Sequence, residues 1–264
     1  MDLGLKGKTA LVTGSTAGIG YAAARALARE GAAVVVNGRT QARVDAAVQT
    51  MKAESGSAAV TGVAADLGTA AGVAALIKQV PTLDVLVNNV AIFEPKDFGD
   101  ITDDDWLRFF ETNVLSGVRL SRQYLPLMKE QNWGRIVFVS SESAINIPAE
   151  MIHYGMSKTA QLAVARGLAE TTAGTAVTIN SVLPGPTNSE GVGTFIKQMA
   201  EASGKDVAAV TEEFFQHVRP SSLLKRFEDV DEIAALITFV CGTVSSGING
   251  AALRVDGGVV RSVV

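Results

Sequence analysis

The chain of 264 residues carries 23 basic and 27 acidic side chains, a net charge of -4, and 47% of its residues are hydrophobic. This apolar share is enough for one large core, and the weakly acidic balance disfavours nucleic-acid binding, which usually needs a basic face. The sequence has no apolar run near the roughly 18 residues that cross a bilayer, no metal-ligand spacing and no N-terminal signal core. We therefore expect a cytoplasmic protein without membrane, nucleic-acid or metal partners.

Short apolar runs alternate with longer stretches of helical spacing along the chain. The runs that predict strands are Thr9–Thr13, Ala33–Asn37, Ala59–Ala64, Asp84–Asn88, Arg135–Ser140, Val177–Val182 and Ala251–Val255. The stretches that predict helices are Ile19–Glu30, Gln41–Glu54, Ala70–Gln79, Asp103–Glu130, His153–Thr172 and Val230–Gly242. Several runs are apolar almost throughout, which is typical of strands buried on both faces of a parallel sheet. The alternation predicts an α/β fold, a single domain over residues 1–264 with a doubly wound, Rossmann-type parallel sheet.

The segment Thr187–Arg226 interrupts this alternation. It follows a predicted strand and contains two stretches of helical spacing, Val192–Ala202 and Val207–Val218. A long excursion at the end of a strand is more often a binding loop than filler, so we interpret it as a helical substrate lid. A packed contact between subunits is the alternative.

A glycine-rich turn joins the first strand to the first helix. Gly14 permits a tight turn, Gly18 lets the backbone approach a pyrophosphate, and Gly20 lets the helix pack close to the strand. The helix N-terminus offers free N–H groups to phosphates. The spacing differs from G-x-G-x-x-G, and the turn lacks the Lys and Ser/Thr of a nucleoside triphosphate loop. The dinucleotide contacts predicted in this turn are Gly14, Ser15, Thr16, Gly18, Ile19 and Gly20.

The end of the second strand bears on the choice of cofactor. NAD-binding folds often carry an acidic residue there, but this chain has Asn37 and then Arg39. Arg39 could face the 2′-phosphate of NADP, which makes NADP the preferred cofactor; if Arg39 is only a solvated residue at a helix start, NAD remains open. Asp66 follows the third strand, where it could reach the adenine amino group or cap a turn.

Four polar residues form a candidate catalytic set. Tyr154 and Lys158 are four positions apart, on one face of a predicted helix. A phenol has a pKa of about 10, so proton transfer near neutral pH needs a nearby cation worth roughly 4 kcal/mol. Ser141 follows the fifth strand, at the edge where doubly wound folds bind ligands. Asn113 lies inside a long predicted helix, where an asparagine can bend the helix and hold a water.

In their joint order these motifs resemble the short-chain dehydrogenase/reductase family, over nearly the whole chain from Thr9 to Gly258. The residues that carry the resemblance are Thr13, Gly14, Gly18, Ile19, Gly20, Asp66, Asn88, Asn89, Asn113, Ser141, Tyr154, Lys158, Asn180, Val182, Pro184, Gly185, Asp256, Gly257 and Gly258. The resemblance implies an NAD(P)-dependent oxidoreductase that transfers a hydride between nicotinamide and a secondary alcohol or ketone.

The resemblance also implies a role for each residue. Tyr154 would be the general acid or base, and Lys158 would hold the nicotinamide ribose and lower the tyrosine pKa. Ser141 would orient the substrate oxygen, and Asn113 would hold a water that links Lys158 to solvent. The implied cofactor contacts beyond the glycine turn are Arg39, Asp66, Leu67, Asn89, Val90, Ala91, Tyr154, Lys158, Pro184, Gly185 and Thr187.

The chain departs from the family pattern at two places. Val90 and Ala91 stand where many members have Ala-Gly, and we expect a small local adjustment. Ala17 stands where NADP-preferring members often have a basic residue, which leaves NAD open. Two rival functions also stay open: a noncatalytic dinucleotide-binding redox sensor or scaffold, and an epimerase or dehydratase of the same fold.

The expected partners are a small carbonyl or alcohol substrate and further copies of the chain. We expect Ile92–Phe98, Glu142–Met151 and the excursion after Thr187 to wall the substrate pocket. Either Glu94 or Glu142 could meet a polar substrate group, and nothing in the sequence singles one out. The resemblance implies a homotetramer in which the helices predicted at 103–130 and 153–172 form one interface.

Overall fold

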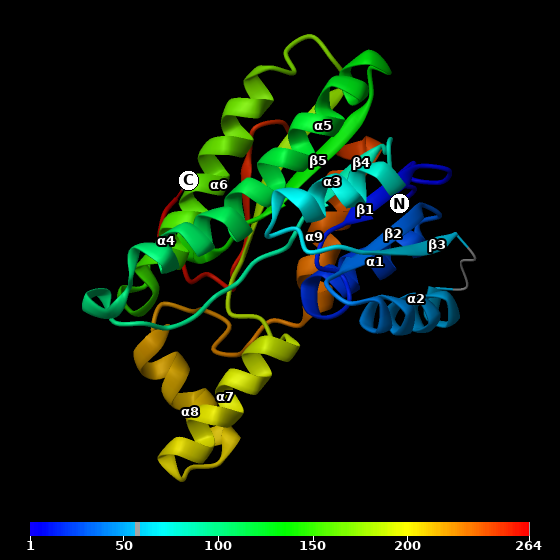
Figure 1. Ribbon diagram of the computed structural model, residues 1–264. Coiled ribbons are helices and arrows are strands. Elements are labelled where there is room, and N and C mark those ends of the chain that lie inside the picture. The colour runs from blue at the N-terminus through cyan, green and yellow to red at the C-terminus, as the bar shows by residue number, and fades with distance from the viewer. Residues whose placement is uncertain (56–58, 264) are drawn as a thin grey trace.

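The computed structural model describes residues 1–55 and 59–263 and is built on one sheet of seven parallel strands (Figure 1). The strands are β1 Thr9–Val12, β2 Ala33–Gly38, β3 Val60–Ala64, β4 Val85–Asn88, β5 Gly134–Val139, β6 Val177–Pro184 and β7 Ala252–Val255. Their order in the sheet is β3-β2-β1-β4-β5-β6-β7. The predicted doubly wound α/β sheet is confirmed, with strand ends within two residues of those expected. The order reverses between β1 and β4, and ligands of such sheets bind in the crevice beyond the carboxyl ends of the strands there.

Helices cover both faces of the sheet. They are α1 Gly18–Arg29, α2 Gln41–Ser55, α3 Ala70–Gln79, α4 Asp103–Phe109, α5 Ser116–Glu130, α6 Ile152–Glu170, α7 Glu190–Ser203, α8 Val207–Glu213 and α9 Val230–Cys241. Short 3-10 turns lie at Phe98–Asp100, Glu142–Ala144, Ala149–Met151 and Thr243–Ser245. None of these helices is long and apolar enough to cross a membrane.

Alternate residues of the central strands face two separate cores. In β1, Val12 packs with the layer that contains Leu27 of α1 and Ile237 of α9. Its neighbour Leu11 packs with the opposite layer, which contains Leu120 of α5. Because both faces are covered, β4, β5 and β6 are buried along their whole length, which explains their continuous apolar runs.

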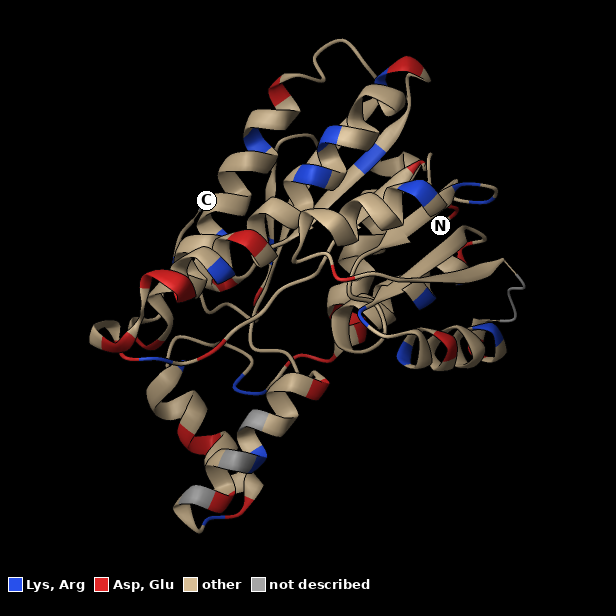
Figure 2. Ribbon diagram, viewed as in Figure 1, with Lys and Arg blue, Asp and Glu red and all other residues tan. Residues whose placement is uncertain are grey.

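The single helix predicted over 103–130 has three parts. Between α4 and α5 the chain forms a π-helical segment, Phe110–Leu115, which contains the buried Asn113. Such widened turns commonly bend a helix and commonly occur at functional sites. The local distortion predicted at Asn113 therefore takes the form of a π-helical turn. The three acidic residues at the start of α4 favour the N-terminus of a helix, and Figure 2 shows them as a red patch there.

The excursion after β6 stands apart from the two layers. Figure 1 shows α7 and α8 as a pair that extends away from the sheet. The two helices enclose a small cluster of their own, formed by Ile196, Ala200 and Val210. A second π-helical segment, Phe214–Val218, continues α8. The two helical stretches predicted in this region are thus confirmed, with α7 beginning two residues earlier than expected.

Candidate active site

The glycine turn is shaped to receive phosphates. Gly14 and Gly18 have φ of 61° and 59°, a region that favours glycine. A Cβ on Gly20 would collide with the side-chain amide of Asn89 and with the Gly14 carbonyl. Helix α1 begins at Gly18 without a side-chain cap and without an acidic residue in its first turn. The N–H groups of its first turn are not bonded to a capping side chain. They are therefore available to bind the pyrophosphate of a dinucleotide.

Asn37 fixes the position of this turn, a role that the sequence had not revealed. Its side chain is 1% exposed and points inward. Its Oδ1 accepts a hydrogen bond from Gly14 N at 3.2 Å, and its Nδ2 donates to Val63 O at 3.1 Å and Ala65 O at 3.2 Å. The residue in the position of the usual ribose-binding acid is therefore committed to the protein. A polar residue at the end of an otherwise apolar strand was the available signal.

Arg39 and Asp66 lie at the ends of neighbouring strands. Arg39 is exposed, and its guanidinium forms no ion pair or hydrogen bond within the described residues. Asp66 is exposed and its Oδ1 accepts a hydrogen bond from Gly68 N at 3.0 Å, which closes a turn. Leu67 is 1% exposed and belongs to the core. Arg39 thus keeps its hydrogen-bonding capacity for a ligand, whereas Asp66 already uses one carboxylate oxygen.

The loops after β1 and β4 are bonded to each other. Thr13 Oγ1 accepts from Asn89 N at 2.8 Å and from Val90 N at 3.0 Å. Asn89 Nδ2 donates back to Thr13 O at 2.9 Å and Gly14 O at 3.1 Å. Val90 lies against Gly14, so its extra bulk is accommodated beside the glycine turn. The departure from Ala-Gly at Val90 and Ala91 leaves these bonds in place.

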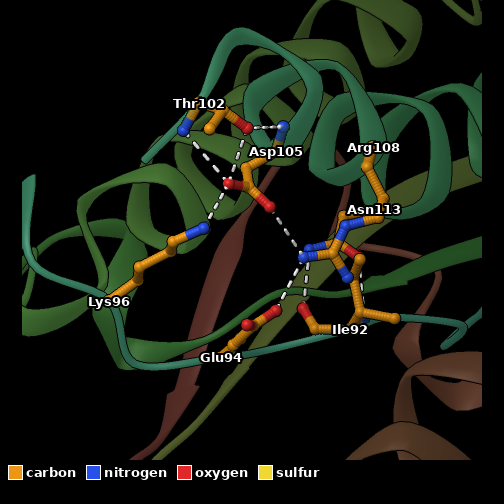
Figure 3. Close-up of polar contacts among 7 residues, drawn as sticks. All are labelled: Ile92, Glu94, Lys96, Thr102, Asp105, Arg108 and Asn113. Carbon is orange, nitrogen blue, oxygen red and sulfur yellow. Dashed lines mark hydrogen bonds and ion pairs between the residues drawn. The ribbon is translucent and has the colours of Figure 1, made fainter. Parts of the chain in front are cut away.

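Asn113 joins the loop after β4 to α6. Its Oδ1 accepts from Ile92 N at 2.8 Å, and its Nδ2 donates to Ile92 O at 3.0 Å and to Ser157 Oγ at 2.9 Å. Figure 3 shows this amide bonded to Ile92. Two residues further along the same loop, Glu94 Oε2 lies 2.6 Å from Arg108 Nη2. Glu94 is exposed and engaged there, so it is not a pocket residue.

Tyr154, Lys158 and Ser141 come together as predicted. Lys158 is 2% exposed, its Nζ donates to Val139 O at 2.9 Å, and Nζ lies 5.6 Å from the Tyr154 ring centroid. Burial lowers the pKa of Lys158 to about 7. Burial raises the pKa of Tyr154 to about 12, against a hydrogen bond to Ser141 that lowers it, and the charge of Glu142 raises it further. The protein by itself therefore favours the neutral phenol.

A cavity of about 600 Å³ opens in front of these residues. The predicted site residues that line it are Ile19, Asn89, Ala91, Ser141, Tyr154, Lys158, Pro184, Gly185 and Thr187. The other predicted residues do not line it. They are Gly14, Ser15, Thr16, Gly18 and Gly20 of the glycine turn, Arg39, Asp66 and Leu67 after β2 and β3, Val90, and Asn113, which is bonded to α6. Helix α7 and the π-helical segment that follows α8 add apolar side chains that include Ile196, Met199 and Phe214. The expected lid thus forms one wall of the cavity.

An ion pair inside the cavity wall was not predicted. Arg219, at the end of the excursion, is 7% exposed, and its Nε donates to Glu142 Oε1 at 2.9 Å. Its Nη1 donates to Glu150 Oε1 at 3.4 Å. Arg219 therefore connects the end of the lid to the segment between β5 and α6, which leads into the helix that carries Tyr154. A sequence offers no signal for an arginine and a glutamate paired across 77 positions.

Comparison with known proteins identifies the family. A profile of the family described as short chain dehydrogenase matches residues 8–200. The chain belongs to the short-chain dehydrogenase/reductase family. This short-chain dehydrogenase/reductase is therefore an NAD(P)-dependent oxidoreductase, in agreement with the family suggested by its motifs.

Relatives match this short-chain dehydrogenase/reductase over nearly its full length. The oxidoreductase YvaG of Bacillus subtilis (strain 168) is 48% identical over 263 residues, covering 100% of both chains. The D-beta-hydroxybutyrate dehydrogenase of Cupriavidus necator is 33% identical over 96% of this chain and 98% of its own. The crystal structure of L-sorbose reductase from Gluconobacter frateurii, complexed with NADPH and L-sorbose, superimposes with a TM-score of 0.94 at 28% identity and 100% coverage of both chains.

Proposed function

We propose that this protein is a carbonyl reductase that uses NADPH to reduce a small ketone to a secondary alcohol. The observation that carries the proposal is the cavity, which brings Ser141, Tyr154 and Lys158 to one wall next to the glycine turn. The reverse oxidation uses the same groups. The whole chain, residues 1–264, would act as one dinucleotide-binding catalytic domain.

The glycine turn and its neighbours would hold the cofactor. The turn from Gly14 to Gly20 binds the pyrophosphate, and Arg39 contacts the 2′-phosphate. Asp66 flanks the adenine together with the backbone of Leu67, whose side chain is buried in the core. The segment Asn89–Ala91 borders the middle of the cofactor, and Pro184, Gly185 and Thr187 border the nicotinamide. When bound, NADPH supplies the hydride. A free Arg39 and the NADPH bound to the related L-sorbose reductase support NADPH over NADH.

The remaining residues position the substrate and handle the proton. Ser141 donates a hydrogen bond to the substrate carbonyl oxygen, and Tyr154 donates the proton to that oxygen during reduction. Lys158 binds the nicotinamide ribose and adds positive charge beside Tyr154. Because burial raises the pKa of Tyr154 to about 12, the phenol is fully protonated at neutral pH, which suits an acid. Asn113 holds the loop after β4 against α6 and so keeps Tyr154 facing the cavity.

The first experiment is a titration of the protein with NADPH and NADH by nicotinamide fluorescence, followed by turnover of ketones. We expect tighter NADPH binding and NADPH oxidation by a ketone. Tyr154→Phe should keep NADPH binding and reduce kcat by at least about 100-fold, because general acid catalysis contributes that much or more. Turnover by the Phe variant at the wild-type rate would remove Tyr154 from the mechanism, and failure to bind either cofactor would remove the whole proposal.

We further propose that the protein is a homotetramer, as the family resemblance implies. Helices α4, α5 and α6 would form one interface. Leu107 and Phe110 support this assignment, since they are 66% and 39% exposed in the single chain although both are large and apolar.

A further inference from the structure

One carboxylate in the cavity wall lacks a full set of partners. Glu142 follows Ser141, is 3% exposed and lines the cavity. Its Oε1 accepts hydrogen bonds from Arg219 Nε at 2.9 Å and Ser143 Oγ at 3.1 Å. Its Oε2 is buried and has no hydrogen-bond partner in the described part of the chain. Because a buried polar atom without a partner is unfavourable, a ligand that forms a hydrogen bond there is stabilised.

The charges around Glu142 decide which kind of group fits. Arg219 balances Glu142 directly, whereas the side chain of Glu150 is 44% exposed and is screened by water. A substrate anion would compete with Glu142 for Arg219, and breaking that buried ion pair is costly. A substrate cation at Oε2 would lie next to the positive charge of Arg219, which repels it. A neutral hydroxyl breaks no ion pair and can donate to the carboxylate.

A hydroxyl also suits both protonation states of the acid. Burial raises the pKa of the Glu142 carboxyl, and the Arg219 charge opposes this. A hydroxyl donates to the ionised form and accepts from the protonated form. Neither an apolar group nor an anion can satisfy the ionised form.

The position of Glu142 indicates where this hydroxyl lies on the substrate. The Ser141 hydroxyl lowers the pKa of Tyr154 and lines the cavity with it, so the two side chains mark the place of the reacting oxygen. Ser141, Glu142 and Tyr154 line the same cavity, so one small substrate can meet all three side chains. Given the proposed reductase activity, we propose that the substrates are α-hydroxyketones, whose hydroxyl beside the carbonyl binds Glu142. NADPH transfers its hydride to the carbonyl carbon and Tyr154 its proton to the carbonyl oxygen, giving a vicinal diol and NADP⁺.

Three ketones of similar size test this assignment with NADPH and the full chain. They are 3-hydroxy-2-butanone, 2-butanone, which lacks the hydroxyl, and 3-oxobutanoate, which replaces it by an anion. We expect kcat/KM for the hydroxyketone to exceed both others by about tenfold or more, the usual effect of one hydrogen bond to a charged group. Equal values for the hydroxyketone and 2-butanone, or preference for the anion, would overturn the assignment while leaving the reductase activity intact.

A matched pair of variants locates the effect. Glu142→Gln should lower the ratio of kcat/KM between hydroxyketone and 2-butanone by roughly tenfold, because a neutral amide forms a weaker bond to the hydroxyl. Glu94→Gln makes the same change at the exposed ion pair with Arg108 and should leave the ratio at the wild-type value. An unchanged ratio in Glu142→Gln contradicts the role of Glu142. If the wild type oxidises NADPH with none of the ketones, the reductase proposal itself fails and this assignment falls with it.

A second feature lies behind Lys158, on the side away from the cavity. Gln161 is 2% exposed and one helical turn further along α6. Its Oε1 accepts from Lys158 Nζ at 3.4 Å, and its Nε2 donates to the backbone oxygen of Asn113 at 2.5 Å. The Asn113 side chain is already engaged with Ile92 and Ser157. The amide of Gln161 therefore bridges the Lys158 ammonium and the backbone of Asn113.

We infer that Gln161 is a positioning residue that holds Lys158 as an ammonium ion and ties it to the backbone of Asn113. An amide oxygen accepts a hydrogen bond from the ammonium, but an amide N–H does not pass a proton on. In the described part of the chain no charged side chain contributes to the state of Lys158, and Tyr154 is its titratable neighbour. The hydrogen bond from Lys158 to Gln161 therefore favours the charged form, against burial.

Two substitutions at Gln161 that should change the pKa of Lys158 in opposite directions test this role through the pH profile of kcat/KM. Gln161→Leu removes the acceptor and should shift the alkaline limb to lower pH by about one unit, because Lys158 then loses its proton more easily. Gln161→Glu adds a negative charge and should shift the same limb to higher pH. A packing role alone would lower kcat in both variants without opposite shifts, and that result would overturn the inference. NADPH binding reports whether each variant is folded.

Discussion

At the residue scale, the end of β2 decides how the adenosine end of a cofactor is recognised. Asn37 cannot serve as the ribose acceptor, because its amide is bonded to Gly14 and to the end of β3. Arg39 is exposed and forms no bonds within the described residues. An unpaired guanidinium matches a phosphate dianion in charge and geometry. We therefore expect recognition of the 2′-phosphate to depend on Arg39.

Arg39→Ala should weaken NADPH binding by at least about tenfold and leave NADH binding unchanged, since only NADPH carries the phosphate. Fluorescence titration of both cofactors measures the two dissociation constants. Arg43→Ala is the matched control, because Arg43 is similarly exposed but is paired with Glu190. Equal losses for NADPH and NADH in Arg39→Ala would show that Arg39 does not read the phosphate.

Glu228 is a buried acid that braces the loop beside the predicted nicotinamide site. It is 3% exposed, and its Oε2 accepts from Gly185 N at 3.1 Å. Its backbone N–H donates to Pro186 O and its carbonyl accepts from Asn188 N. Burial raises the pKa of Glu228 to about 7. The carboxyl therefore changes its charge in the physiological pH range while holding this loop.

Glu228 should make the folded protein less stable as the pH rises. Its pKa is raised from 4.5 in the unfolded chain to about 7, so its contribution is fully present below about 4.5 and is lost as the pH rises through about 7. Urea unfolding at several pH values measures the free energy of unfolding of the wild type and of Glu228→Gln. As the pH rises between these limits, the variant should become more stable relative to the wild type, by at most about 3 kcal/mol. The amide oxygen of Gln can still accept from Gly185 N. Parallel pH curves for the two proteins would place the ionisation elsewhere.

At the element scale, α4 is fixed at its N-terminus by a capping box. Thr102 Oγ1 accepts from Asp105 N at 3.2 Å, while Asp105 Oδ2 accepts from Thr102 N at 3.0 Å. Lys96 Nζ lies 2.6 Å from the same carboxylate, as Figure 3 shows. These contacts join the start of α4 to the loop after β4. The π-helical segment that follows then places Asn113 against Ile92.

Thr102→Ala should lower the free energy of unfolding by about 1 kcal/mol, because it removes the hydroxyl that caps α4. Urea denaturation measures the change. Thr50→Ala is the control, since Thr50 is exposed in the middle of α2 and, among residues 1–55 and 59–263, its hydroxyl bonds only to Ala46 O of the same helix. Alanine is the better helix former there, so stability should stay equal or rise slightly. A loss in Thr50→Ala as large as in Thr102→Ala would rule out the cap as the cause.

At the scale of the whole molecule, the protein consists of a rigid sheet with two cores and a smaller helical pair beside the cavity. The pair has its own apolar cluster, Ile196, Ala200 and Val210. Arg219 bonds the end of this excursion to Glu142 and Glu150 near Tyr154. The substrate end of the cavity is therefore built from segments that are far apart in sequence.

The proposed homotetramer predicts a mass in solution of four times that of one chain. Leu107→Arg places a charge on the exposed apolar surface of α4 and should produce smaller species in light scattering while NADPH binding remains. Val244→Arg is the control, because Val244 is also apolar, 46% exposed and next to α9, outside the proposed interface. A wild-type protein that is monomeric at micromolar concentration would contradict the assembly.

The sequence by itself determined the fold class, because strands buried on both faces are apolar throughout and can be recognised one element at a time. It also predicted Ser141, Tyr154 and Lys158 as a group, since their spacing and order are local. Only the tertiary structure decided which carboxylate reaches the cavity. Glu94 and Glu142 were equivalent in the sequence, but Glu94 is paired at the surface while Glu142 is buried against Arg219. Likewise, Asn37 and Gln161 act through partners on other elements, and such contacts depend on how the layers pack, which no local pattern encodes.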